Sequence, residues 1–109
     1  MTVERLPRED RAALMRDQRR DKIMRAAVSE ASRSGYRNMT RGDIASSAGV
    51  ALGSINHEFG TMDGLRDAVM QEAVKTRRLD IVAQGLADGH AAARDAPAEM
   101  REAAVRALA

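Results

Sequence analysis

The stretch TRGDIASSAGVALGSINHEFG, residues 40–60, decides the fold of this chain. It divides into two short helical segments, 41–48 and 52–59, separated by a tight turn at Gly49. Glycine tolerates the positive φ angle that such a turn needs, and the small Ala45 lets the two helices approach closely. The spacing predicts a helix-turn-helix, a unit whose second helix normally enters the major groove of DNA.

The same stretch carries the end signals and the apolar residues that this unit requires. Thr40 followed by Asp43 is a capping pair, in which each side chain can satisfy an unpaired amide of the first turn, although aspartate is shorter than the usual glutamate. Val50 and Ile55 would fill the wedge between the helices, and Ile55 shares an apolar stripe with Phe59. The local signals agree with one another, which favours a specified fold over an ordinary helical hairpin.

The rest of the chain shows helical patterns and no alternation typical of strands. Residues 16–22 contain no apolar side chain, so we expect either an exposed stretch of helix or a solvated arm. Apolar residues at helical spacing resume over 23–31 and end near Gly35. A longer helix is predicted over 63–83 and a short one over 97–108. The chain is therefore predicted to be all-α.

The C-terminal helices raise the question of what covers their apolar faces. Gly85 and Gly89 are expected to interrupt the alanine-rich stretch between the two helices. One hypothesis is that helices 63–83 and 97–108 pack against a second copy of the chain, because an amphipathic helix needs a surface to cover. The alternative is a frayed alanine-rich tail. The residues that this dimer would bury are Val69, Val74, Ile81, Val82, Met100, Val105 and Leu108.

Composition and charge exclude several classes of protein. Hydrophobic residues make up 44% of the chain, yet Tyr36 and Phe59 are the only aromatic ones, so small aliphatic side chains must build the core. The absence of cysteine excludes a disulfide scaffold and a thiolate metal site. The formal charge of +2 does not by itself indicate nucleic-acid binding, but residues 1–60 hold 11 basic and 8 acidic side chains, whereas residues 61–109 hold 7 and 8.

No enzyme class, cofactor or metal is indicated by the sequence. His57 and His90 lie far apart without carboxylates at helical spacing, and Ser54 lacks the strand-turn-helix context of a hydrolase nucleophile. No apolar run approaches the roughly 20 residues that a membrane span requires. The start MTVERLPRED has no apolar signal-peptide core, so we expect a cytoplasmic protein.

The chain from about residue 23 to residue 65 resembles the N-terminal DNA-binding domain of the TetR family of transcriptional regulators. The resemblance implies a three-helix helix-turn-helix domain at 23–62, an N-terminal helical and basic arm at 1–22, and a helical segment at 63–109 that contributes to dimerisation. Loop lengths and glycines agree as well as apolar positions. The matching residues are Ile23-Met24-Arg25-Ala26-Ala27, Gly35-Tyr36, Thr40, Ile44-Ala45, Ala48-Gly49-Val50, Gly53-Ser54-Ile55, Phe59-Gly60, Asp63 and Leu65.

The resemblance also implies which residues contact DNA. Thr40 would bind a phosphate through its hydroxyl or the helix N-terminus, and the neighbouring Arg41 is also expected at the DNA. Residues 52–58 would form the recognition helix. Three residues would form the basic arm that many family members lay along the groove: Arg19, Arg20 and Lys22.

Five positions depart from what the family usually has, and they gather on the expected DNA-binding side. Ala51 replaces a serine or threonine cap, which costs about 1 kcal/mol. Leu52 stands where many members have a basic residue, and Asn56 where they have a tyrosine that contacts phosphate. Glu58 replaces a histidine or tyrosine, and Met62 replaces a lysine. Because each lost phosphate contact removes counterion release, we expect lower affinity and a shallower salt dependence.

The recognition-helix residues still offer groups that can read bases. Asn56 could form a bidentate pair with adenine, Ser54 could bond to a base or a phosphate, and Leu52 could contact a thymine methyl. Gly53 lets the backbone approach the sugar-phosphate chain. His57 could contact a base or phosphate, although a histidine on a surface helix often has no such role.

Two functions are therefore weighed. The first is a dimeric repressor that occupies a palindromic operator, with double-stranded DNA and a second copy of the chain as partners. The second is a helix-turn-helix scaffold that binds another protein through a neutral-to-acidic surface formed by Leu52, Asn56, Glu58 and Met62. Only about 27 residues follow Val82, so a small-molecule effector pocket is not expected. The chain would be a naturally short regulator, an excised domain or this protein-binding scaffold.

Overall fold

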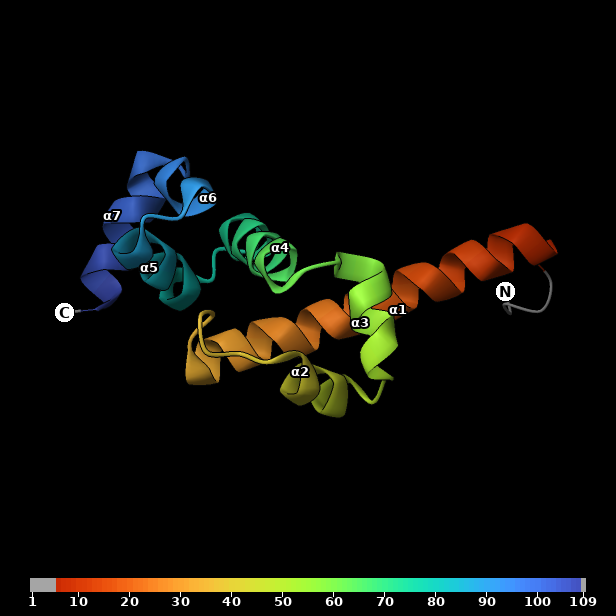
Figure 1. The fold of residues 1–109 in the computed structure, drawn as a ribbon. Helices are drawn as coiled ribbons and strands as arrows, with labels where there is room; N and C mark the ends of the chain where they lie inside the picture. Colours follow the sequence, from red (N-terminus) through yellow and green to blue (C-terminus); the bar gives the residue numbers. More distant parts are fainter. Residues whose placement is uncertain (1–5, 109) are drawn as a thin grey trace.

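The computed structural model describes residues 6–108, and within this range the chain is all-helical without a strand, as predicted (Figure 1). The helices are α1 (Arg8–Ser34), α2 (Arg41–Ala48), α3 (Leu52–Phe59), α4 (Met62–Lys75), α5 (Leu79–Asp88), α6 (Ala91–Arg94) and α7 (Ala98–Ala107). Residues 1–5 of the expected N-terminal segment lie outside the described residues, as does Ala109. None of the described helices combines the length and apolar composition that a bilayer crossing requires.

Helix α1 is one continuous helix of 27 residues, which decides between the two conformations expected for residues 16–22. The charged run forms an exposed stretch of helix, and the expected boundary at 22/23 falls within α1. Figure 1 shows the N-terminal half of α1 extending beyond α3, away from the other helices. Met15, on this projecting half, is consequently 57% exposed.

The N-terminal core is formed where α1, α2, α3 and α4 meet. Helix α1 packs against α2 and α4, and α3 packs against both α2 and α4. Ile23, Ile44, Ile55 and Leu65, one from each helix, are at most 1% exposed. Burying four such side chains contributes about 1.5–3 kcal/mol each before the loss of chain entropy is counted. This core fixes the angle at which α3 is held.

The long helix predicted over 63–83 is wrong, because the chain turns between α4 and α5. Arg77 has a φ of 60°, in the left-handed region that costs a non-glycine residue about 1–2 kcal/mol. Its guanidinium donates to both carboxylate oxygens of Glu99 on α7, at 2.9 and 2.6 Å. The turn also lets α5 fold back, so that Ile81 and Val82 are completely buried. The hydrogen bonds to Glu99 and the burial of Ile81 and Val82 offset the free-energy cost of the strained backbone at Arg77.

Gly85 does not interrupt a helix as predicted, but lies within α5 at a close helix contact. A Cβ atom at this position would lie 2.6 Å from the sulfur of Met70 and 2.7 Å from the Cβ of Ala93. The glycine therefore lets α5 approach α4 and α6 more closely than any other residue would allow. Gly89, with a φ of 73°, does end α5.

The residues expected at a dimer interface are mostly used within the chain itself. Val69, Ile81 and Val82 are fully buried, and Met100 is 9% exposed, so none of them offers a surface to a second copy. Their predicted place in an intermolecular interface is wrong, because α5 packs against both α4 and α7 within one chain. The apolar residues left outside are Val105, 59% exposed, and Leu108, 68% exposed.

A polar cluster joins the N-terminal core to α5. The Tyr36 hydroxyl donates to Asp88 at 2.5 Å, and Nε of Arg37 donates to the same carboxylate at 2.8 Å. Gln84 accepts from the backbone amide of Tyr36 and donates to the carbonyl of Ala31. The bonds from Arg37, and then Tyr36, lower the pKa of Asp88, while burial raises the pKa of Tyr36. The loop before α2 is thereby tied to the C-terminal helices.

Candidate nucleic-acid interface

Helices α2 and α3 are joined by the tight turn that the sequence predicts. Gly49 adopts a left-handed conformation with a φ of 68°, and Val50 donates a backbone hydrogen bond to the carbonyl of Ala45 at 3.1 Å. Ile55 is 1% exposed and Ala45 is 7% exposed, which places both between the helices. The helix-turn-helix geometry is therefore confirmed, with α3 as the second helix.

The start of α2 is capped and faces solvent. The Thr40 hydroxyl accepts a hydrogen bond from the backbone amide of Asp43 at 3.1 Å, which is one half of the predicted capping pair. Thr40 is exposed, and the first-turn amides of a helix favour an anion. The geometry is thus compatible with a phosphate at the start of α2, the role that was expected for Thr40.

The outer face of α3 carries most of the residues expected to read bases. Leu52 is 51% exposed, and Gly53, Asn56 and His57 are also exposed, whereas Ser54 is half-buried. A Cβ atom at position 53 would meet nothing within 4 Å, so the surface beside this glycine is open. Ile55 and Phe59 point to the opposite side and hold the helix on the core. One side of α3 is anchored, and the other is free to enter a groove.

Helix α3, the expected recognition helix, begins without a side-chain cap, as the sequence predicts. Ala51 occupies the N-cap position in an extended conformation, with φ −72° and ψ 149°, and makes no capping hydrogen bond. This backbone suits serine, whose hydroxyl would accept from an amide of the first turn.

Ala51→Ser is therefore expected to raise the free energy of unfolding by about 1 kcal/mol. Chemical denaturation followed by circular dichroism measures the difference. Ala51→Val is the matched control, because valine adds side-chain atoms without a hydroxyl and is as poor an N-cap as alanine. Equal unfolding free energies for the serine variant and the wild type would contradict a missing cap.

Arg20, expected in the basic arm, instead contacts the end of α3. One guanidinium nitrogen donates to the backbone carbonyl of Glu58 at 2.9 Å and lies 3.9 Å from Oε2 of the Glu58 carboxylate. The guanidinium also lies over the Phe59 ring, 4.3 Å from its centre. Positive charge is favourable at a helix C-terminus, so Arg20 stabilises and orients α3. Arg19 and Lys22 are exposed on α1.

Glu58 and Met62 do not form part of an outward surface. The Glu58 side chain is only 12% exposed, and among the described residues its Oε1 atom is buried without a hydrogen-bond partner. Met62 packs against the hydrophobic core. The expectation that Glu58 lies on the DNA-binding side of α3 is therefore wrong. Its carboxylate turns toward α1.

One contact on the outer side links α2 to α3 and was missed by reasoning from the sequence. A guanidinium nitrogen of Arg41, the first residue of α2, donates to Oδ1 of Asn56 at 2.6 Å. The two residues are 15 positions apart, and nothing in the sequence pairs them. The tight turn at Gly49 is what brings them together.

The comparisons with known proteins agree with this geometry. The sequence model of the family described as "Bacterial regulatory proteins, tetR family" matches residues 23–69. This range spans most of α1 after its projecting half, all of α2 and α3, and the first half of α4. Searches among curated proteins and among solved structures found no match.

Proposed function

We propose that this chain, which carries a TetR-family helix-turn-helix domain at residues 23–69, is a sequence-specific repressor that occupies an operator as a homodimer in the cytoplasm. The family is one of DNA-binding transcription regulators. The proposal requires no catalysis, because a bound protein blocks a promoter sterically. Its partners are double-stranded DNA and a second copy of the chain.

The observation that carries the proposal is the two-sided character of α3. Ile55 is buried and fixes the helix, while Leu52, Asn56 and His57 are exposed on its surface. A helix of eight residues is long enough to present one turn to the base edges in a major groove. Thr40 at the start of α2, with Arg19 and Lys22 on α1, would supply phosphate contacts.

The protein-binding alternative is less well supported by the same surface. It requires Leu52, Asn56, Glu58 and Met62 to form one exposed patch. Only Leu52 and Asn56 are exposed, because the other two side chains turn toward the core. The remaining pair is too small for a stable protein interface, which usually involves about 20 or more residues on each side.

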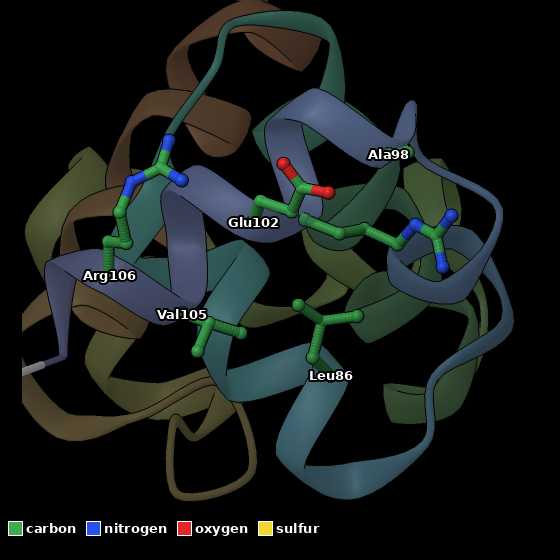
Figure 2. A pocket seen from close by; sticks show the side chains of 6 residues that line it. Leu86, Ala98, Glu102, Val105 and Arg106 are labelled. Carbon is green, nitrogen blue, oxygen red and sulfur yellow. The ribbon is translucent and has the colours of Figure 1, made fainter.

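The proposed dimer contact is an open groove of about 570 Å³ between α5 and α7. Figure 2 shows Leu86 and Val105 at this groove, with Glu102 and Arg106 along α7. Glu102 and Arg106 both line this groove, one turn apart on α7. An apolar surface flanked by charges of both signs suits a two-fold contact, because each charged residue of one copy can pair with a residue of opposite charge in the other copy.

Selection of bound sequences from a randomised duplex library with the full chain tests the proposed function. We expect enrichment of a palindrome, whose half-site spacing reports the distance between two recognition helices. Arg19→Ala should weaken binding to all duplexes alike and reduce the slope of log affinity against log salt by about 1. Enrichment of no sequence by the folded protein would contradict the proposal.

A further inference from the structure

The contact between Arg41 and Asn56 determines which hydrogen-bonding groups the recognition surface offers. The guanidinium of arginine has five N–H donors and no acceptor, so the Asn56 atom that it contacts at 2.6 Å must be the carbonyl oxygen. The amide orientation of Asn56 therefore follows from chemistry. Its NH₂ group is left to face an approaching base.

The pair consequently presents donors rather than a donor beside an acceptor. Reading adenine in bidentate fashion requires Oδ1 of Asn56 to accept from the adenine amino group while Nδ2 donates to N7. One lone pair of Oδ1 is already used by Arg41. An amino group at the second lone pair would also lie against a positively charged guanidinium, which makes adenine unfavourable.

Guanine presents a pattern of hydrogen-bond acceptors that complements the donors of Arg41 and Asn56. Its major-groove edge carries two acceptors, O6 and N7, and no donor. The Asn56 amide hydrogens and the unused N–H groups of Arg41 match these two acceptors, and the guanidinium charge strengthens the bonds. Arg41 belongs to α2 and Asn56 to α3. Because both residues would contact the same base, they also fix the orientation of the two helices relative to that base.

We propose that Arg41 and Asn56 act together as one guanine-reading unit, in place of the adenine expected from Asn56 alone. This inference rests on the proposed DNA-binding function. It assigns specificity to a side chain of α2, the helix that would otherwise contact only the backbone. We expect the wild type to prefer guanine over adenine at one position of each half-site by about 5- to 100-fold.

Bound-sequence selection with the full-length wild type, Asn56→Ala and Arg41→Ala tests this unit. The two substitutions should alter preference at the same position. Asn56→Ala should weaken the guanine preference, because Arg41 alone still donates. Arg41→Ala should move the preference toward adenine, because the amide oxygen of Asn56 is released. Asn56 is exposed, Arg41 is half-buried, and neither belongs to the buried core, so circular dichroism should show folded variants.

A change in the DNA provides a test that leaves the protein intact. Replacing that guanine by 7-deazaguanine removes the N7 acceptor, and wild-type affinity should fall roughly tenfold. The 7-deazaguanine DNA should weaken binding by the Arg41→Ala variant less than binding by the wild type, because the charged donor is already gone and only the Asn56 amide can still bond to N7. Enrichment of a palindrome with adenine at the Asn56-dependent position, or effects of the two variants at different positions, would overturn the guanine assignment while leaving the DNA-binding function standing. Enrichment of no sequence would overturn both.

Discussion

Replacing Ile55 with alanine is expected to lower the free energy of unfolding by about 2–5 kcal/mol and to abolish recognition of a selected DNA site. Ile55 is 1% exposed and lies where α3 meets the core. Removing its branched side chain leaves a cavity in the core where α3 packs against α2 and α4. A domain of this size has a total stability of about 5–15 kcal/mol, so the loss is a large fraction. Denaturant unfolding and a DNA-binding titration measure the two effects.

Leu52→Ala provides the matched control, because Leu52 lies on the same helix and is 51% exposed. Its truncation should change the unfolding free energy by no more than about 0.5 kcal/mol. Binding should nevertheless weaken, and any preference for thymine beside the helix should relax. If Leu52→Ala destabilised the protein as much as Ile55→Ala, or if Ile55→Ala bound its site normally, the division of α3 into an anchored and a reading side would be wrong.

The features of α2 and α3 that the sequence predicted are those that short-range chemistry determines. The positive φ at Gly49, the Thr40 cap and the missing cap at Ala51 each depend on residues within a few positions. The burial of Ile55 follows from apolar spacing along one helix. For such features the local preference and the tertiary fold agree, so a single sequence is enough.

The features that were missed depend on contacts between distant segments. Arg20 and Glu58 are 38 residues apart, and their contact exists only because α3 ends beside α1. No spacing rule could distinguish this arginine from the exposed Arg19. As a result, Arg20, which was expected to bind DNA, holds α3 in place, and Glu58, which was expected on the DNA-binding side, is turned inward.

The C-terminal helices were mispredicted for a related reason. Val74 and Ile81 keep helical spacing across the break between α4 and α5, so the pattern there is the same as in one long helix. No glycine or proline marks the break. The left-handed Arg77 is tolerated because Glu99 holds its guanidinium, and that contact spans 22 residues. Folding back then buries residues that the sequence assigned to a second copy of the chain.

Because folding back buries most of the apolar residues of α4 and α5, the proposed dimer contact depends on few residues. Val105→Asp should therefore disrupt the dimer. Val105 is 59% exposed in one copy and lies at the groove between α5 and α7. A carboxylate there would be buried at the interface without a fixed partner, and a two-fold contact contains the substitution twice. We expect the dimer to dissociate into monomers at micromolar concentration. Affinity for a palindrome should fall by at least about 100-fold, because each half-site then binds alone.

Light scattering measures the oligomeric state, and titrations with full and half palindromes measure the coupling between sites. Ala107→Asp is the matched control, since it adds the same charge to an exposed position of α7 that does not line the groove. It should leave the dimer intact. Val105→Asp should bind a half-site as well as the wild type does, because Val105 lies on α7, outside the helix-turn-helix. A monomeric wild type, or a Val105→Asp variant that remains dimeric, would show that this groove is not the dimer contact. Loss of half-site binding as well would instead mean that α7 supports the fold of the DNA-binding helices.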